Sequence, residues 1–294
     1  MYKLFFFIII NFLSTGCRNM HDTNDLKTQI QNKFSTEKGT FALAFKTVEK
    51  DPIEILINAD DVFHAASTMK TPVMVEAFKQ QKAGRFNLDD SVIVKNEFKS
   101  IVDGSLFSLD ISRDGGEQLY GFIGKKRKVY DLVYDMIIHS SNLATNIVIE
   151  YLGAENVTST MRDLGALNIQ VLRGVEDIKA FDEGLNNTTT ARDLMIIFEK
   201  IASGQAVDQE SSRKMINILF DQQYNEIIPA LLPQDVRVAH KTGSISGVQH
   251  DSGIVFLPDG RKYVLVLLSK NLENSDSAVK MMAEISLMLY QFIQ

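Results

Sequence analysis

Segments with strand character lie at both ends of the chain, and segments with helical character lie between them. The strand-like segments, rich in β-branched and aromatic residues, are 40–48, 53–58, 236–243, 252–257 and 262–269. Turn residues at 49–52 join the first two, and Pro258-Asp259-Gly260 joins the last two. The simplest packing places both groups of strands in one antiparallel sheet, with the helical block as an insertion.

Apolar residues recur every three or four positions in several segments, which predicts helices. One such helix lies near each end of the chain, and the others fall in the middle block. We therefore predict an α+β fold, an α/β sandwich, in which an antiparallel sheet is flanked by N- and C-terminal helices and carries an inserted all-helical domain. The predicted sheet domain comprises 18–66 and 221–294, and the predicted helical domain comprises 67–220. A cleft between the two is the natural place for a site.

The first residues, "MYKLFFFIIINFLSTGC", have the pattern of a secretory signal. The run from Leu4 to Leu13 is apolar except for Asn11 and is too short to span a bilayer as a helix. Cys17 is the only cysteine of the chain and stands where cleavage is expected, which resembles a bacterial lipoprotein signal. The aliphatic residue usual three places before that cysteine is Ser14 here.

We therefore predict that residues 1–17 are a signal peptide of the lipoprotein type, with plain secretion and a retained anchor as the alternatives. The expected location is the bacterial cell envelope, in the periplasm, with a lipid anchor at Cys17 in the first case. A lipidated Cys17 leaves the mature domain without a free thiol. Disulfides, thiol nucleophiles and cysteine metal sites are then excluded.

Net charge argues against a nucleic-acid partner. The chain has 294 residues and a formal net charge of −6. Its one run of basic residues, "GKKRK" at 124–128, indicates a solvated loop. His-Glu-x-x-His and related ligand spacings do not occur in the sequence, so we expect no metal and no other cofactor.

Three short motifs fall at the edges of predicted elements. Ser67-Thr68-Met69-Lys70 opens the first helix of the insertion, Ser140-Ser141-Asn142 lies in the break between two helices, and Lys241-Thr242-Gly243 ends a strand. The first motif alone is weak, because Ser-x-x-Lys occurs four times and usually means a helix cap followed by a solvated lysine. The ordered set of three is a much stronger signal of an active site.

The residue types of these motifs suit nucleophilic catalysis. A serine hydroxyl needs a base within hydrogen-bond reach, and Lys70 shares a helix face with Ser67 at i+3. Lysine can act as a base where burial and a nearby cation, such as Lys241, destabilise its charged form. The Ser67 N–H and a second N–H at Ser244 could bind a developing oxyanion. Ser140 could relay a proton to the leaving nitrogen.

The motifs resemble those of the penicillin-recognising serine enzymes, most closely the class A β-lactamases. The similarity runs from about residue 24 to the end of the chain. It implies the β-lactamase/transpeptidase-like fold and a small-molecule substrate, a β-lactam or a peptidoglycan-like peptide. It also implies acylation of Ser67 and proton transfer by Lys70 and Ser140. The expected substrate-binding residues are Asn142, Lys241, Thr242, Gly243 and Ser244.

The sequence departs from the family in the second motif and in the loop before Thr188. Ser141 stands where the family usually has a largely structural aspartate. The family also carries a glutamate in that loop which activates the deacylating water, with an asparagine four places later. Glu176 is our choice for this catalytic residue, although Ala180 stands at the asparagine position. Asp182 or Glu183, or no equivalent at all, remain as alternatives.

The histidines raise a competing interpretation, because His64, His139, His240 and His250 all lie beside motif elements. A Ser-His-Asp hydrolase would be consistent with this, but Gly-x-Ser-x-Gly does not occur in the sequence. His240 alternates with Lys241 along a strand, so the two side chains should point to opposite faces. We interpret the histidines as packing residues.

The resulting prediction is a monomeric serine β-lactamase that works through an acyl-enzyme on Ser67. A related serine hydrolase, D,D-peptidase or esterase-like, with slow or no β-lactam turnover is the first alternative. The second is a non-catalytic envelope binding lipoprotein, against which the intact set of Ser67, Lys70, Ser140 and Lys241 argues. The loop around Glu176 distinguishes the two enzymes.

Overall fold

The computed structural model describes residues 15–294. Its centre is a five-stranded sheet in the order β2-β1-β11-β10-β9, and each neighbouring pair is antiparallel. The strands are β1 (Thr40–Thr47), β2 (Glu54–Ile57), β9 (Arg237–Ile245), β10 (Val248–Phe256) and β11 (Lys262–Lys270). The predicted union of the two terminal strand groups in one sheet is therefore confirmed.

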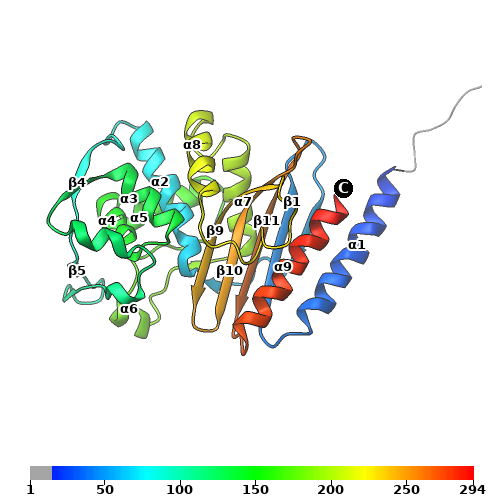
Figure 1. The fold of residues 1–294 in the computed structure, drawn as a ribbon, viewed down its shortest axis with the longest axis horizontal. Coiled ribbons are helices and arrows are strands. Elements are labelled where there is room, and N and C mark those ends of the chain that lie inside the picture. The colour runs from blue at the N-terminus through cyan, green and yellow to red at the C-terminus, as the bar shows by residue number, and fades with distance from the viewer. Residues whose placement is uncertain (1–14) are drawn as a thin grey trace, which may run out of the picture.

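Three layers result, as Figure 1 shows: the two terminal helices cover one face of the sheet and the helical block covers the other. The terminal helices are α1 (Thr15–Phe34) and α9 (Ser275–Phe292). The block contains α2 (Lys70–Lys82), α3 (Val129–Ile138), α4 (Asn142–Leu152), α5 (Ala154–Asp163), α6 (Ile178–Asp182), α7 (Ala191–Ala202) and α8 (Gln209–Phe220). The predicted α+β class, with an antiparallel sheet between the terminal helices and an inserted helical block, is confirmed.

Alternation along the central strands explains the two cores. On β1, Phe41, Leu43 and Phe45 pack under α1 and α9, whereas Ala42 and Ala44 face the helical block. Successive side chains of a strand point to opposite faces, and both faces of this strand are covered, so the strand is apolar throughout. The small alanines leave room for α7, which contacts β1, β10 and β11.

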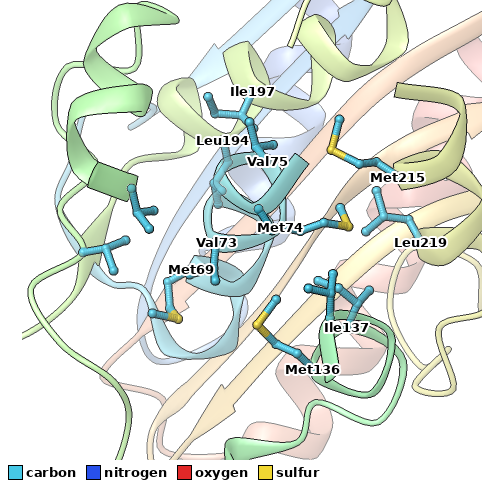
Figure 2. Packing of buried hydrophobic residues seen from close by; sticks show 14 of the residues in the cluster. Met69, Val73, Met74, Val75, Met136, Ile137, Leu194, Ile197, Met215 and Leu219 are labelled. Carbon is cyan, nitrogen blue, oxygen red and sulfur yellow. The ribbon is translucent and has the colours of Figure 1, made fainter. Parts of the chain in front are cut away.

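Helix α2 is the axis of the helical block. It is buried almost all round: Figure 2 shows Val73, Met74 and Val75 surrounded by side chains of α3, α7 and α8. The helix therefore lies in the middle of the core, and its buried polar residues Glu76 and Gln80 are hydrogen-bonded to each other. The rigid packing of α2 fixes the residues at its N-terminus, where the first motif lies.

The remaining elements are short. They are the 3₁₀ helices η1 (Ala66–Met69), η2 (Ile111–Arg113) and η3 (Glu117–Phe122), and the short strands β3 (Phe63–His64), β4 (Ser91–Ile93), β5 (Phe98–Lys99), β6 (Leu106–Phe107), β7 (Lys126–Lys128) and β8 (Thr188–Thr189). The division at 66/67 and 220/221 into two domains stays a prediction.

The third motif lies inside a strand rather than at its end, because β9 runs on to Ile245. The next strand also begins earlier than predicted, at Val248 instead of 252. Gly247, with φ +71°, makes the tight turn between the two strands. The polar residues of "VQHD" concealed this part of β10 from the sequence pattern.

The predicted apolar signal run from Leu4 to Leu13 lies outside the described residues. Within 15–294, no helix has the length and apolar character needed to cross a membrane. The signal-peptide and lipid-anchor assignments therefore remain predictions.

Candidate active site

Ser67 is the second residue of η1 and lies just before α2. The position before η1 is Ala65, and no side chain caps the helix there. The helix-cap interpretation of Ser67 is therefore wrong. The preceding Ala66 has φ +44°, a left-handed conformation that is strained for any residue with a Cβ.

Lys70 lies one turn after Ser67 and is fully buried. Its Nζ donates to the Ser140 carbonyl oxygen at 2.7 Å, to Ser140 Oγ at 3.2 Å and to Asn142 Oδ1 at 3.0 Å. Burial lowers the pKa of Lys70 to about 7, although the Asp114 and Glu176 carboxylates act to raise it. A substantial fraction of Lys70 is therefore neutral at neutral pH.

Lys241 on β9 is also fully buried. Its Nζ lies 3.2 Å from Ser140 Oγ and 3.0 Å from the Thr242 carbonyl oxygen. Burial, and then the nearby positive charge of Lys70, lower the pKa of Lys241 well below its ordinary value. The Ser140 hydroxyl thus connects the two lysines.

Ser140 occupies the break between α3 and α4 with φ +56°. The next residue, Ser141, is buried and caps α4 by accepting a hydrogen bond from Ala144 N–H at 3.1 Å. Ser141 therefore has a structural role, like the largely structural aspartate that is usual at this position of the family.

Asp114, which the sequence did not single out, supports the second motif. Its buried carboxylate accepts from the backbone N–H groups of Asn142 at 2.9 Å and Leu143 at 2.8 Å. It also accepts from Gly116 N–H at 2.8 Å and from the Tyr120 hydroxyl at 3.0 Å. Asp114 precedes two glycines in an irregular loop, and no spacing relates it to Ser140, so only the tertiary fold connects them.

Glu176 faces the second motif from the loop before α6. Its Oε1 accepts from Asn142 Nδ2 at 2.7 Å, and its backbone has φ +61°. Asn146 of α4 holds the same loop, accepting from Val175 N–H at 2.6 Å and donating to the Val175 carbonyl oxygen at 3.0 Å. Ala180, at the expected asparagine position, is fully buried inside α6.

A cavity of about 630 Å³ collects most of the predicted residues. Its lining includes Ser67, Ser140, Asn142, Glu176, Thr242, Gly243 and Ser244. Lys70 and Lys241 lie buried outside this lining, whereas the exposed Asp182 and Glu183 lie outside it at the surface. The geometry therefore brings Glu176, rather than its two alternatives, to the site.

Gly243 lets β9 approach η1 closely. A Cβ built at this position would lie 3.1 Å from Ser67 N and 3.2 Å from Thr68 N. Because side-chain carbons rarely come so near to backbone, a larger residue would push the strand away from Ser67.

The histidines take no part in a Ser-His-Asp arrangement. His240 is buried on the face opposite Lys241, with Nδ1 2.9 Å from Asp251 Oδ1 and Nε2 3.2 Å from Asn225 Oδ1. No hydrogen bond joins a histidine ring to Ser67 within residues 15–294. Over the same part of the chain, no group of three or more His, Cys, Asp or Glu side chains is arranged to hold a metal ion.

Comparison with known sequences gives one consistent family. The profile of the "Beta-lactamase enzyme family" matches residues 25–293. Extended-spectrum β-lactamase PER-1 of Pseudomonas aeruginosa is 24% identical over 279 residues, which cover 91% of this chain and 87% of that protein.

Comparison with solved structures confirms the predicted β-lactamase/transpeptidase-like fold. PBP-A is 27% identical with a TM-score of 0.78, covering 92% of this chain and 96% of that one. A PBP-A mutant solved as an acyl-enzyme complex with penicillin-G is 28% identical with the same TM-score and coverage. The TLA-1 extended-spectrum β-lactamase has a TM-score of 0.80 at 20% identity, over 92% of this chain and 99% of that one.

Proposed function

The chain belongs to the β-lactamase enzyme family, and from this premise we propose that it is a serine β-lactamase that opens the β-lactam amide through an acyl-enzyme on Ser67. One observation carries the proposal: two buried lysines of lowered pKa, Lys70 and Lys241, converge on the Ser140 hydroxyl beside a cavity lined by Ser67. The class A relatives and the penicillin acyl-enzyme of a PBP-A mutant support it.

Acylation begins with neutral Lys70 taking the proton of the Ser67 hydroxyl as Oγ attacks the β-lactam carbonyl carbon. The Ser67 and Ser244 backbone N–H groups bind the oxyanion that forms. Ser140 then passes its proton to the leaving nitrogen and recovers one from a neighbouring lysine ammonium. The C–N bond breaks and an ester on Ser67 remains.

Thr242 and Lys241 bind the substrate carboxylate beside the third motif. An anion there favours the protonated form of Lys241, whose pKa burial lowers in the free protein. Substrate binding therefore charges Lys241 and strengthens its attraction for the carboxylate. Gly243 keeps this strand edge against Ser67.

Deacylation requires a water activated by a base, and Glu176 is the proposed base. Asn142 orients its carboxylate by a hydrogen bond of 2.7 Å. Glu176 takes a proton from the water, whose oxygen attacks the ester carbon, and Ser67 leaves with the proton returned through Lys70. No second amide stands at position 180 to help hold the water, because Ala180 occupies it.

The presence of Ala180 instead of an asparagine favours one alternative, a related D,D-peptidase or esterase-like serine hydrolase. Such an enzyme is acylated by β-lactams but hydrolyses the acyl-enzyme slowly. The strained backbone of Glu176, at φ +61°, adds to this case because small shifts of the loop would displace its carboxylate.

Intact mass after mixing with penicillin distinguishes the possibilities. We expect a transient adduct in the wild type, a persistent adduct in Glu176→Gln and none in Ser67→Ala. A chromogenic cephalosporin assay should show hydrolysis by the wild type alone. A persistent adduct in both the wild type and Glu176→Gln would instead support the slow hydrolase, and hydrolysis unchanged in Ser67→Ala would overturn the mechanism. A wild type that forms no adduct with any β-lactam tested would support a binding protein.

We also propose that the protein acts as a monomer in the periplasm, with residues 1–17 as its export signal and a lipid at Cys17. Metabolic labelling with a fatty acid should mark the wild type but not Cys17→Ser. A soluble, unlabelled wild type in the periplasmic fraction would contradict the anchor while leaving export intact.

A further inference from the structure

The residue before the nucleophile holds a strained backbone. Ala66 has φ +44°, a left-handed conformation that is unfavourable for a residue with a Cβ. Ala65 and Thr68 are tied on either side, since Ala65 N–H donates to the Asn187 carbonyl oxygen at 2.8 Å and Thr68 N–H donates to the Ala65 carbonyl oxygen at 3.0 Å. Neither bond restrains the Ala66 N–H itself, so another group must hold this peptide.

That group is His64, a residue that also lines the cavity. Its Nδ1 accepts a hydrogen bond from Ala66 N–H at 3.0 Å, across two residues. This is the geometry of an Asx turn, in which a short side chain accepts from the backbone two positions later. An accepting Nδ1 cannot carry a proton, so the ring must be neutral and protonated on Nε2.

A second histidine holds the first. His250 of β10 is fully buried, and its Nε2 lies 2.9 Å from the His64 carbonyl oxygen. The Gln249 carbonyl oxygen lies 2.9 Å from Nδ1 of the same ring, and a neutral ring has a proton for only one of the two carbonyls. Ser269 N–H donates to Nδ1 at 3.1 Å, which leaves the proton on Nε2 and directs it to His64.

The surroundings keep both rings neutral. Burial lowers the pKa of His64, and the Arg173 guanidinium lowers it further. Burial also lowers the pKa of His250 to about 4, although its contacts with the His64 and Gln249 carbonyl oxygens act to raise it. The Phe181 ring of α6 packs edge-on against His64 at 6.1 Å between ring centroids, which holds the imidazole plane.

We propose that His64 and His250 are positioning residues that hold Ala66 in its left-handed conformation and so aim the Ser67 backbone N–H and hydroxyl for acylation. The contacts run in sequence from Ser269 through His250 and His64 to the peptide beside Ser67. The inference rests on the proposed acylation of Ser67. It assigns to histidines a role in the chemistry that is neither nucleophile activation nor simple packing.

Two substitutions of His64 separate the acceptor from the ring. His64→Leu keeps the bulk but removes the acceptor, whereas His64→Asn keeps an oxygen that can accept from Ala66 N–H as in an Asx turn. We expect His64→Leu to lower the acylation rate constant by about tenfold or more, with little change in the substrate dissociation constant, because an oxyanion donor acts in the transition state. His64→Asn should recover to within about threefold of the wild type.

NMR spectroscopy tests the hydrogen bond between His64 and Ala66 N–H in the free protein, without any substrate. ¹⁵N NMR of the histidine side chains in the free wild-type protein should show His64 as the Nε2-protonated tautomer at neutral pH. Amide exchange at Ala66 should speed up in His64→Leu and return toward the wild-type rate in His64→Asn.

Three results would overturn the proposal: an Nδ1-protonated or charged His64 at neutral pH, an acylation rate in His64→Leu within about twofold of the wild type, or a His64→Asn variant as impaired as His64→Leu. If His64→Leu fails to fold, the tautomer of His64 in the wild type and the acylation rate of His64→Asn still test the proposal. A wild type that forms no acyl adduct contradicts the proposed function. The tautomer of His64 and the amide exchange at Ala66 then test the positioning role separately.

Discussion

Lys70 and Lys241, from a helix and a strand far apart in the sequence, share one hydrogen-bond acceptor: each Nζ lies 3.2 Å from Ser140 Oγ. Two ammonium ions so close together and fully buried would repel each other strongly, and burial lowers the pKa of both. In the free protein the two lysines are therefore not both protonated. One lysine is available as a base, and the other is available to be charged by an anionic substrate.

Acylation should depend on pH through Lys70. Its pKa is about 7, so the residue is protonated and inactive as a base below that pH and becomes competent as pH rises through it. Single-turnover acylation measured from about pH 5 to about pH 9 should therefore rise with a midpoint near neutrality. A rate that is flat across this range would show that another group takes the Ser67 proton.

Asp114 should tune this midpoint. Its carboxylate raises the pKa of Lys70, so Asp114→Asn should lower that pKa and move the acylation midpoint toward acid. The variant should also lose about 2 kcal/mol of unfolding free energy, because the new amide N–H₂ faces backbone donors at Asn142 and Leu143. Asp110→Asn is the control, an exposed cap of η2 with small expected effects on both quantities. An unchanged midpoint in Asp114→Asn, at measurable activity, would remove the electrostatic role.

Gly243→Ala should impair acylation more than folding. The new Cβ would lie 3.1 Å from Ser67 N, so the strand or η1 must shift by a fraction of an ångström. We expect the acylation rate to fall by about tenfold or more, since misplaced reacting groups lose rate steeply. Gly121→Ala is a matched control, because a Cβ there meets nothing within 4 Å. Equal acylation rates in the two variants would mean that β9 and η1 accommodate the added Cβ without displacing Ser67.

Asn146→Ala should separate deacylation from acylation. It removes both hydrogen bonds to Val175 that hold the loop of Glu176, but it touches neither Ser67 nor Lys70. We expect a loss of about 2 kcal/mol in unfolding free energy. The acyl-enzyme seen by mass spectrometry should also last longer than in the wild type.

Asn156→Ala serves as its control, because the Asn156 side chain, in the first turn of α5, donates to the Leu152 carbonyl oxygen at the end of α4. A normal acyl-enzyme lifetime in Asn146→Ala would indicate that Glu176 holds its place without this bond. A slowed acylation step would show instead that the loop also shapes the Ser67 side of the cavity.

Most of the fold could be predicted, because the strands and helices of this chain have clear periodic patterns. The two strand groups, the covering terminal helices and the helical character of the insertion follow from such patterns, whereas the separate helices α5, α6 and α8 were not predicted. The start of β10 could not, since Gln249, His250 and Asp251 are polar and yet lie in the sheet. Their burial depends on partners such as Ser269 and Ile228, which only folding brings near.

The candidate site divides in the same way. Ser67, Lys70, Ser140 and Lys241 were predictable because motif order and local chemistry single them out. Asp114 and the positioning contact of His64 were not, because their function lies in bonds to backbone groups, and backbone groups leave no signature in a sequence. The histidines were predicted to be packing residues, and the hydrogen bond between His64 and Ala66 N–H is the basis for the additional role proposed for His64.

By itself the sequence determined the fold class and singled out the proposed nucleophile with its lysine, because side-chain types and their spacing along one chain are local properties. Tertiary structure alone decided the protonation chemistry. The pKa of Lys70 depends on how much water is excluded and on the distances to Asp114 and Glu176. Those quantities are set by packing between segments that no local pattern connects.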